Sequence, residues 1–201
     1  MNARLADATE IRASSSSGEE ALRCVVVVRK AGLEVGRLEE SLHPEGTQRP
    51  TLDAIGQGRF IKPGKSVTPV SYLKAQSGPG EFIVQGKTLS YGESDLMLRA
   101  SRGAVSVRVD GWNIEFAPPR GAALAAGEYA NTKRPPFNNE FPGLEFTGHG
   151  RGSTASSGSF VIWEIAIEDD KVVHFAADFI IRSDGKGPPL CGMLRYKSSF
   201  Q

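Results

Sequence analysis

Three charged residues near the C-terminus are the strongest candidates for chemistry in this sequence. Glu164, Asp178 and Arg195 each lie in a strand-like run, and the expected strand pairing puts both carboxylates on the face that points away from the core. There they could form a polar cleft that holds a ligand or the carboxylate of a partner. The alternative is an ion-pair cluster that keeps three strands in register, the commoner role of such groups. His174 and Arg151 are the further candidate contacts for a ligand or partner.

The same region contains residues that resemble two catalytic arrangements, a hydrolase triad and a phosphate-binding loop. Ser153, His149 and Asp178 are the residue types of a hydrolase triad, but no nucleophile-elbow spacing surrounds the serine. Gly148–Gly158 has the composition of a phosphate-cradling loop, yet a strand is expected to follow it where such a loop needs a helix. No Cys/His spacing suits zinc, so no metal or cofactor is predicted. A hydrolase of unknown substrate is the second alternative to a non-catalytic module.

Aromatic residues suggest a carbohydrate-binding β-sandwich as the first alternative. Trp112 and Trp163 could stack on sugar rings, although both are expected on the apolar face of their strands. An exposed aromatic row would otherwise need Tyr72, Tyr91 and Tyr129. We therefore expect a binding or structural module that acts through a protein partner or self-assembly, with carbohydrate as the alternative ligand.

The elements that position the candidate residues are expected to be strands over Ser159–Glu168, Lys171–Arg182 and Leu190–Lys197, because apolar residues alternate in the first two. An odd loop at Asp169–Lys171 would bury eight apolar side chains together. At about 1.5 kcal/mol or less apiece, that burial outweighs any turn preference. This register pairs Val161, Trp163, Ile165 and Ile167 with Phe179, Ala177, Phe175 and Val173, and on the outer face it pairs Glu164 with Ala176, Ile162 with Asp178 and Ala166 with His174.

A second hairpin is expected over Ala104–Ala117. Asp110-Gly111 tolerates the positive φ angles of a two-residue type I′ turn, whose twist matches the flanking strands. The turn would place six apolar residues on one face: Val105, Val107, Val109, Trp112, Ile114 and Phe116. The opposite face would carry Arg108, Asn113 and Glu115.

The composition is typical of an all-β protein, since 23 glycines and 12 prolines fall between short apolar runs. With 24 Lys and Arg against 23 Asp and Glu, no charge block suggests a nucleic-acid partner. The longest apolar stretch, Val25–Val28, is too short to span a membrane. The first residues lack the apolar region of a secretory signal, which predicts a cytoplasmic protein if the chain is complete.

Three segments are expected. Residues 1–20 are polar and predicted to be flexible. Residues 21–78 would add a buried strand over Ala21–Lys30, a short helix over Leu33–Leu42 and a proline-rich segment that wraps the core with short edge strands. Residues 79–201 would form the core, an antiparallel two-sheet β-sandwich or flattened barrel of roughly eight to ten strands.

A set of short motifs is spread over the chain from about Tyr91 onward. They are GAVSV (Gly103–Val107), WNIEFA (Trp112–Ala117), GEY (Gly127–Tyr129), RPPF (Arg134–Phe137), PGLEFTGHGRG (Pro142–Gly152), FAADF (Phe175–Phe179) and GMLRYKS (Gly192–Ser198). In these motifs, somewhat over half of the chain resembles a β-module of unassigned function found in bacterial secreted and surface proteins. The resemblance implies an all-β fold and extracytoplasmic relatives, and it implies no activity.

Cysteine usage separates this chain from those relatives. Cys24 and Cys191 lie far apart in sequence and are expected to be unpaired core residues, although a disulfide between them is possible. The resemblance implies a disulfide at the positions of Ser153 and Ser183, so these two serines should lie close together. Their joint replacement by serine is what a reducing compartment, or the loss of selection for the bond, would leave behind.

Overall fold

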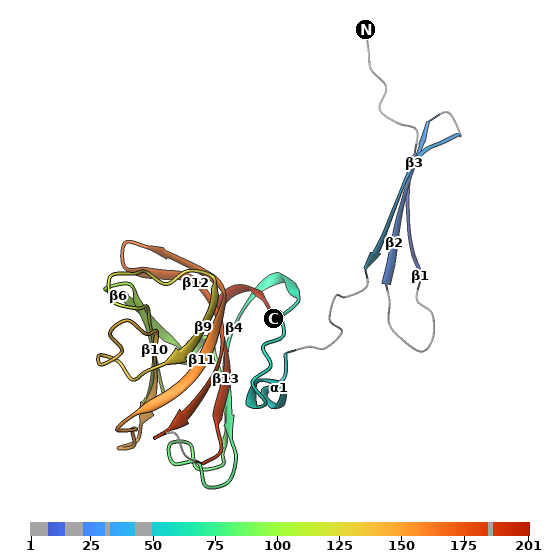
Figure 1. Cartoon of the computed structure of the whole chain (residues 1–201). Coiled ribbons are helices and arrows are strands. Elements are labelled where there is room, and N and C mark those ends of the chain that lie inside the picture. The colour runs from blue at the N-terminus through green and yellow to red at the C-terminus, as the bar shows by residue number, and fades with distance from the viewer. Residues whose placement is uncertain (1–7, 15–21, 31–32, 43–49, 185–186) are drawn as a thin grey trace. The chain divides into compact units, whose positions relative to one another are not determined.

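The computed structural model describes residues 8–14, 22–30, 33–42, 50–184 and 187–201 (Figure 1). The chain divides into two units, Met1–Gln48 and Arg49–Gln201. This division differs from the expected segments, which placed residues 49–78 with the N-terminal extension. The difference arises because residues 65–77 form a strand inside the main sheet of the second unit.

The first unit is a three-stranded antiparallel sheet of β1 (Ala8–Ser14), β2 (Leu22–Lys30) and β3 (Leu33–Leu42), with β2 in the middle. The strand expected over residues 21–30 is β2. The helix predicted over Leu33–Leu42 is wrong, because that segment pairs with β2 along its length and supplies hydrogen-bonding partners for one side of the valine-rich strand. A strand, β1, also occupies part of the segment expected to be flexible.

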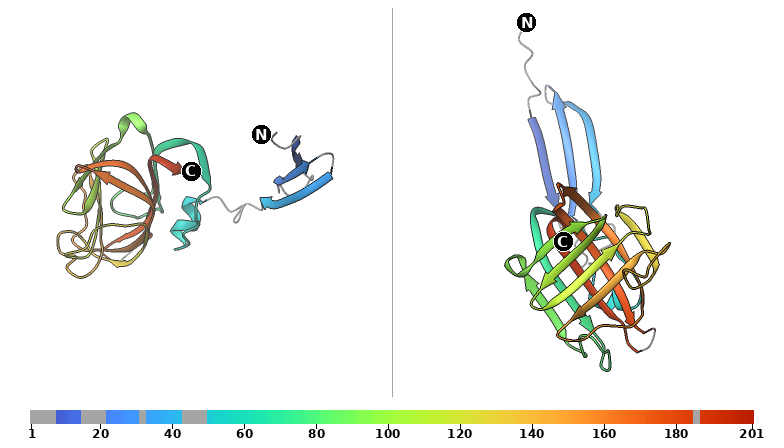
Figure 2. Two further views of the ribbon diagram at one scale, coloured as in Figure 1. Left: turned by 90° about the horizontal axis from the view of Figure 1, so that it is seen from above. Right: turned by 90° about the vertical axis from the view of Figure 1, so that its left-hand side faces the viewer.

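The second unit is an antiparallel β-sandwich, as predicted (Figures 1 and 2). Its six-stranded sheet has the order β5-β4-β13-β12-β11-β9 and its four-stranded sheet the order β10-β8-β7-β6. The elements are α1 (Leu52–Gly56), β4 (Lys65–Ser77), β5 (Thr88–Gly92), the 3₁₀ turn η1 (Glu93–Asp95), β6 (Met97–Ser101), β7 (Ala104–Val109), β8 (Trp112–Ala117), β9 (Gly127–Thr132), β10 (Gly143–Gly148), β11 (Ser156–Glu168), β12 (Lys171–Ser183) and β13 (Leu190–Phe200).

Strand β4 replaces the expected edge strands of the proline-rich segment. It lies between β5 and β13, and its proline is tolerated for a local reason. Pairing with β5 covers only Tyr72–Gln76, so Pro69 lies beyond the end of that ladder. Pairing with β13 is also irregular next to Pro69, where Ser198 pairs with Val70 after a register shift.

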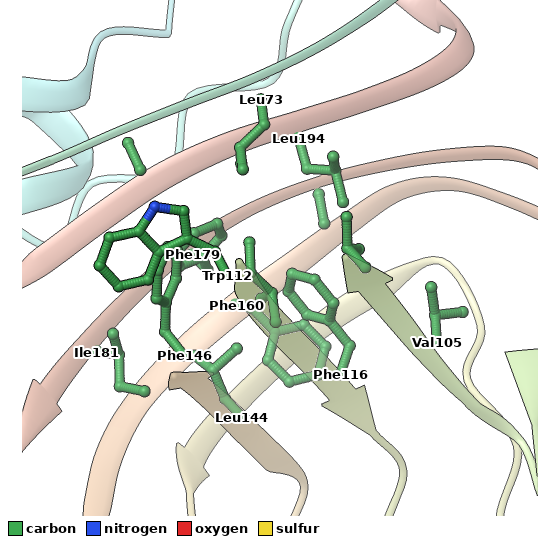
Figure 3. Packing of buried hydrophobic residues seen from close by; sticks show 14 of the residues in the cluster. Leu73, Val105, Trp112, Phe116, Leu144, Phe146, Phe160, Phe179, Ile181 and Leu194 are labelled. Atoms are coloured by element: carbon green, nitrogen blue, oxygen red, sulfur yellow. The ribbon is translucent and has the colours of Figure 1, made fainter. Parts of the chain in front are cut away.

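The main core fills the space between the two sheets (Figure 3). Phe116 on β8 is fully buried and reaches across to three phenyl rings of the six-stranded sheet. Its ring centroid lies 5.3 Å from that of Phe160, 5.4 Å from that of Phe175 and 5.8 Å from that of Phe179. The tilted and edge-on arrangements are those that aromatic pairs prefer.

The β7–β8 hairpin is confirmed. Asp110 and Gly111 both have positive φ, 45° and 76°, and Val109 pairs with Trp112 across the two-residue turn. Trp112 is 5% exposed and belongs to the main core, as expected from the alternation of the strand. On the outer face of the same hairpin Glu115 lies opposite Ser106.

The β11–β12 hairpin has the expected pairing in its centre, but a register shift within the strands produces it in place of an odd loop. The prediction of an odd loop is wrong: Glu168 pairs with Lys171 around a two-residue turn in which Asp169 and Asp170 have positive φ. A register shift after Ala166 then places Ile165 opposite Phe175, as predicted. A β-bulge therefore supplies the one extra residue that a three-residue loop was expected to supply.

A second register shift, between Ile162 and Glu164, changes which residues face the core. It places Val161 opposite Asp178 and Ile162 opposite Ala177, so the predicted pairing of Ile162 with Asp178 is wrong. The core positions predicted for Val161, Trp163 and Val173 are instead taken by their neighbours Phe160, Ile162 and Val172. Ile167 is 37% exposed, because the last turn of this hairpin extends beyond the core.

A smaller apolar cluster covers the other face of the six-stranded sheet. Ile55 of α1 packs there against Ile180, Cys191 and Met193 of β12 and β13, with Leu52, Phe60 and Tyr72 at its margin. Helix α1 begins after Thr51, whose hydroxyl accepts the Ala54 amide as an N-cap. The middle strands of this sheet are thus buried on both faces, which accounts for their nearly continuous apolar sequence.

Truncation of Trp112 tests the hairpin register. Trp112→Ala should lower the free energy of unfolding by about 3–5 kcal/mol in denaturant titrations, because the indole is buried against Phe146 and leaves a cavity. The control is Val67→Ala, at a fully exposed side chain, which should change stability by less than about 0.5 kcal/mol. A loss below about 1 kcal/mol for Trp112→Ala would contradict its burial.

Candidate functional site

Of the two carboxylates expected near Arg195, Asp178 forms an ion pair with it and Glu164 does not. Arg195 Nη1 lies 2.7 Å from Asp178 Oδ1, and both side chains are fully buried. The same nitrogen donates to the carbonyl oxygens of Leu194 (2.9 Å) and Ala177 (3.2 Å). Strands β12 and β13 bring the two residues together, because Asp178 pairs with Met193 and Arg195 with Ala176 on the same face.

The surroundings of the pair are those of a structural element. Trp163 Nε1 donates to Asp178 Oδ2 at 2.8 Å, and the Arg195 guanidinium lies 6.0 Å from the ring of Tyr72. Burial raises the pKa of the Asp178 carboxyl, whereas the Arg195 charge and the two hydrogen bonds oppose that rise. Neither side chain is accessible to solvent, so the pair does not line an open cleft.

Glu164 has a separate set of partners on β13. Its carboxylate accepts hydrogen bonds from the Ser198 hydroxyl (2.8 Å), the Ser199 amide (2.9 Å) and the Ser199 hydroxyl (2.8 Å). Glu164 lies opposite Ala176, as predicted, and this small residue lets it reach across β12. Burial alone would raise the pKa of Glu164. The serine hydrogen bonds and the nearby charge of His174 outweigh burial and hold the pKa below its ordinary value.

His174 and Arg151 occupy different places. His174 lies opposite Ala166, as predicted, and is half-buried near Glu164. Arg151 follows β10, where its Nε donates to the Ile83 carbonyl oxygen at 2.7 Å and its guanidinium lies 5.6 Å from the Trp112 ring. Four of the five predicted residues therefore share the outer face of the six-stranded sheet, and Arg151 holds loops at the end of the sandwich.

The residues considered for a hydrolase triad are not arranged as one, because His149 and Asp178 are bonded to other groups. His149 Nε2 lies 2.8 Å from the Asp110 carbonyl oxygen, and its ring packs on Trp112. Asp178 is committed to Arg195. Ser153, the third member, is buried.

The aromatic residues considered for sugar binding do not form an exposed row. Tyr129 stacks on Phe160 with ring centroids 4.5 Å apart, and Tyr72 packs on the cluster beneath α1. Tyr91 donates to Asp110 Oδ2 at 3.0 Å. Trp163, predicted in the core, is partly exposed and bonded to Asp178.

The Cys191 thiol is buried and free, and it donates to the Leu52 carbonyl oxygen. Burial, with a smaller effect of the Asp53 charge, raises its pKa to about 11. The side chain of Cys24 lies outside the described part of the chain, so the state of that thiol stays a prediction. The closeness of Ser153 and Ser183 also stays a prediction; Ser183 pairs with Ser156.

An open cleft of about 500 Å³ lies on the outer face of the four-stranded sheet, and the sequence did not predict it. Small side chains from β7 and β8 form much of its floor, together with the carboxylate of Glu115. Turns and loops at the end of the sheet form its walls. The lining residues are Ser101, Arg102, Ala104, Ser106, Glu115, Ala117, Pro118, Pro119, Arg120, Gly121, Ala122, Pro135, Pro136, Asn138 and Asn139.

Hydrogen bonds fix the walls of this cleft. The buried Asn138 amide donates to the carbonyl oxygens of Pro118 (3.0 Å) and Phe141 (2.8 Å). The Arg120 amide donates to the Asn139 carbonyl oxygen at 2.8 Å. Four of the lining residues are prolines, whose φ angles are restricted by the ring. The cleft is therefore held in shape without a ligand.

A row of cross-strand neighbours crosses the floor. Ser106 lies opposite Glu115, and Glu115 lies opposite Glu145. Glu145 is paired with Arg134, whose Nε lies 2.6 Å from its Oε1. Glu115 has no hydrogen bond or ion pair to any side chain of the described residues, and burial followed by the charge of Glu145 raises its pKa.

Two exposed phenyl rings lie beside the cleft in sequence. Phe137 is 69% exposed and Phe141 is 38% exposed, and neither lines the cleft. Both belong to the β9–β10 segment that supplies the lining residues Pro135, Pro136, Asn138 and Asn139. Lys133 lies 5.4 Å from the Phe141 ring and Arg134 6.0 Å from the Phe137 ring. The alternation of β8 predicted that Glu115 faces outward, but no local signal placed these loops around it.

Comparisons with protein-family models, with curated proteins and with solved structures found no match to this chain. Over the ranges that the structure describes, no helix has the length and apolar character needed to cross a membrane. Within the same ranges, no three His, Cys, Asp or Glu side chains gather in a way that could hold a metal ion.

Replacement of Arg195 tests whether the buried ion pair acts as one unit. Arg195→Met should cost about 3–5 kcal/mol in chemical denaturation, because it leaves the Asp178 charge buried without its partner. Adding Asp178→Asn should recover part of this loss, since the neutral amide removes the charge and still accepts the Trp163 N–H. Equal stability of the single and double variants would contradict the coupling.

Two glutamate variants should shift the melting temperature in opposite directions at pH 7. The pKa of Glu164 is lowered on folding, so its charge stabilises the fold above pH 4.5, and that gain is lost as pH falls through the folded pKa. The pKa of Glu115 is raised, so its charge destabilises the fold once pH exceeds 4.5. Glu164→Gln should therefore melt lower and Glu115→Gln higher than the wild type.

Both differences should shrink toward acid pH, where all the carboxyls are protonated, and calorimetry from pH 3 to pH 8 measures them. Shifts of the same sign for the two variants at pH 7 would show that the partners of these carboxylates are assigned wrongly.

Proposed function

We propose that the C-terminal unit is a non-catalytic binding module that engages a protein partner over the cleft on the outer face of the four-stranded sheet. One observation carries the proposal: the β9–β10 segment supplies both a wall of the cleft and the exposed phenyl rings of Phe137 and Phe141. Exposed aromatic side chains beside a concave surface are typical of protein interfaces.

The composition of the surface favours a protein over a small molecule. The cleft is open, and its lining mixes proline and alanine side chains with arginine, asparagine and one carboxylate. Small-molecule pockets are usually more enclosed and more apolar. The basic residues Lys133 and Arg134 lie against the two phenyl rings and would form a polar rim around an apolar centre.

The rigidity of the walls supports the same role. Asn138 and the prolines hold the two loops together, so binding would not have to order them. The entropy cost of association is smaller for a surface that already has its bound shape. The resemblance to secreted β-modules, which carries no activity, is also consistent with a module that binds and does not catalyse.

The other functions have weaker support. Carbohydrate binding needs aromatic side chains free to stack, and the tyrosines and tryptophans considered for it are engaged in packing or hydrogen bonds. Self-assembly would use the same exposed rings, with a second copy of the chain as the partner. Hydrolysis finds no support in the positions of Ser153 and His149.

Peptide selection tests the proposal directly. The full chain is immobilised and used to select from a displayed library of random dodecapeptides, and in parallel it is applied to a glycan array. Selected peptides should bind with affinities that fall about tenfold or more in the Phe137→Ala/Phe141→Ala double variant, because exposed aromatic residues dominate such interfaces.

The matched control is Phe82→Ala, which removes another exposed phenyl ring (55%) from a different loop and should leave peptide affinity unchanged. Equal loss in both variants, or binding to glycans in place of peptides, would contradict the proposal. Light scattering at increasing concentration identifies self-association, which the double variant should abolish if the partner is a second copy.

A further inference from the structure

We infer that Glu115, at the floor of the cleft, receives a lysine or arginine side chain of the protein partner. This inference rests on the binding role proposed above for the cleft and specifies the chemistry of its occupant. It is carried by the position of one carboxylate that forms no ion pair with any described residue and that lines a cleft whose walls are held by hydrogen bonds.

The surroundings of Glu115 explain why its partner must come from outside. It is the one acidic residue of the lining, it is half-buried, and its carboxylate makes no ion pair or side-chain hydrogen bond with the described residues. Arg108 is the diagonal neighbour of Glu115 on the same face, but it is exposed and forms no ion pair with Glu115 among the described residues. Arg134 is engaged with Glu145 at 2.6 Å. A partly desolvated carboxylate without a counter-charge favours a cation, and arginine or lysine forms strong charge-assisted hydrogen bonds with it.

The floor leaves room for such a side chain. Ser106 lies between Glu115 and Arg99 in the cross-strand row, and Ala104 and Ala117 are the neighbouring floor residues. These three side chains are short, so the carboxylate is reached from the cleft without displacing a larger group.

The charges that face Glu115 come from the neighbouring strands and from two loops. Glu145 of β10 lies directly opposite, and Arg108 of β7 is an exposed diagonal neighbour at roughly 7 Å. Arg99 of β6 lies two strands away at roughly 10 Å, and Arg102 and Arg120 are exposed at the rim. The two rim arginines are solvated and screened, so they repel an entering cation less than Glu115 attracts it. They are suited to acidic residues that flank the basic residue of the partner.

Proton linkage is a consequence that can be measured. Burial and the charge of Glu145 raise the pKa of the free Glu115 carboxyl, and a bound cation would lower it again. Binding therefore releases a proton, and affinity should fall as pH decreases through the pKa of free Glu115. A neutral side chain at this position should remove that pH dependence.

The test uses two small probes of equal shape and different charge. N-acetyl-arginine amide and its neutral isostere N-acetyl-citrulline amide are titrated into the ¹⁵N-labelled full chain. The arginine probe should shift amide resonances of the cleft with millimolar affinity, and the citrulline probe should bind about tenfold more weakly because it lacks the charge. Glu115→Gln should abolish the difference between the probes and the pH dependence.

The matched variant is Glu140→Gln, which removes an exposed negative charge from the same loop region without touching the lining. It should bind the arginine probe as the wild type does. Equal binding of the two probes, shifts outside the cleft, or the same loss in both variants would overturn the inference.

The two proposals fail in distinguishable ways. If selected peptides lose affinity on Phe137→Ala/Phe141→Ala but not on Glu115→Gln, the docking surface stands and the cation inference falls. If the peptides shift resonances on another face of the sandwich, the proposed surface itself is wrong.

Discussion

Burial of the facing sheets against each other is the constraint on which the rest of this structure depends. Phe116 of the four-stranded sheet packs among three phenyl rings of the six-stranded sheet, and the strand alternation around it assigns every other residue to the interior. Side chains available for function must then lie on the outer faces. One of these faces, on the six-stranded sheet, is partly covered by α1 and its apolar cluster, whereas the four-stranded sheet carries an open cleft.

On the covered face of the six-stranded sheet, the charged residues Asp178 and Arg195 are buried and paired with each other. Two ionised groups removed from water cost several kcal/mol each. The ion pair, the three hydrogen bonds of Arg195 Nη1 and the hydrogen bond from Trp163 to the second carboxylate oxygen offset part of that cost. Arg195 Nε and Nη2 have no partner among the described groups. Such a pair fixes the alignment of β12 and β13 more than it adds stability, which is the role that the buried geometry favours.

The sequence predicts the fold correctly where the turn residues and the apolar alternation of one segment are enough to determine its structure. The Asp110-Gly111 turn and the alternation around it determine the β7–β8 hairpin, because turn chemistry and burial agree there. In the β11–β12 hairpin two local signals disagree. Two aspartates stabilise a two-residue turn, whereas the alternation of apolar residues requires an odd number of residues between the paired positions. A β-bulge supplies the extra residue, and neither signal alone predicts which residue then faces outward. Strand β3 was missed for a related reason, since its leucines fit a helical stripe and only pairing with β2 decides the outcome.

The contrast between Glu164 and Glu115 explains why the candidate site was harder to predict than the fold. Both are outward-facing glutamates on strands, and no property of the two residues taken singly separates them. Three hydrogen bonds from Ser198 and Ser199 satisfy Glu164, whereas the described neighbours leave Glu115 beside another carboxylate. A carboxylate whose hydrogen bonds are satisfied within the protein contributes to stability. One that lacks such partners destabilises the fold, and its presence is explained if it serves function. That difference depends on residues far apart in the chain, and it is the reason that we propose the cleft lined by Glu115 as the recognition surface.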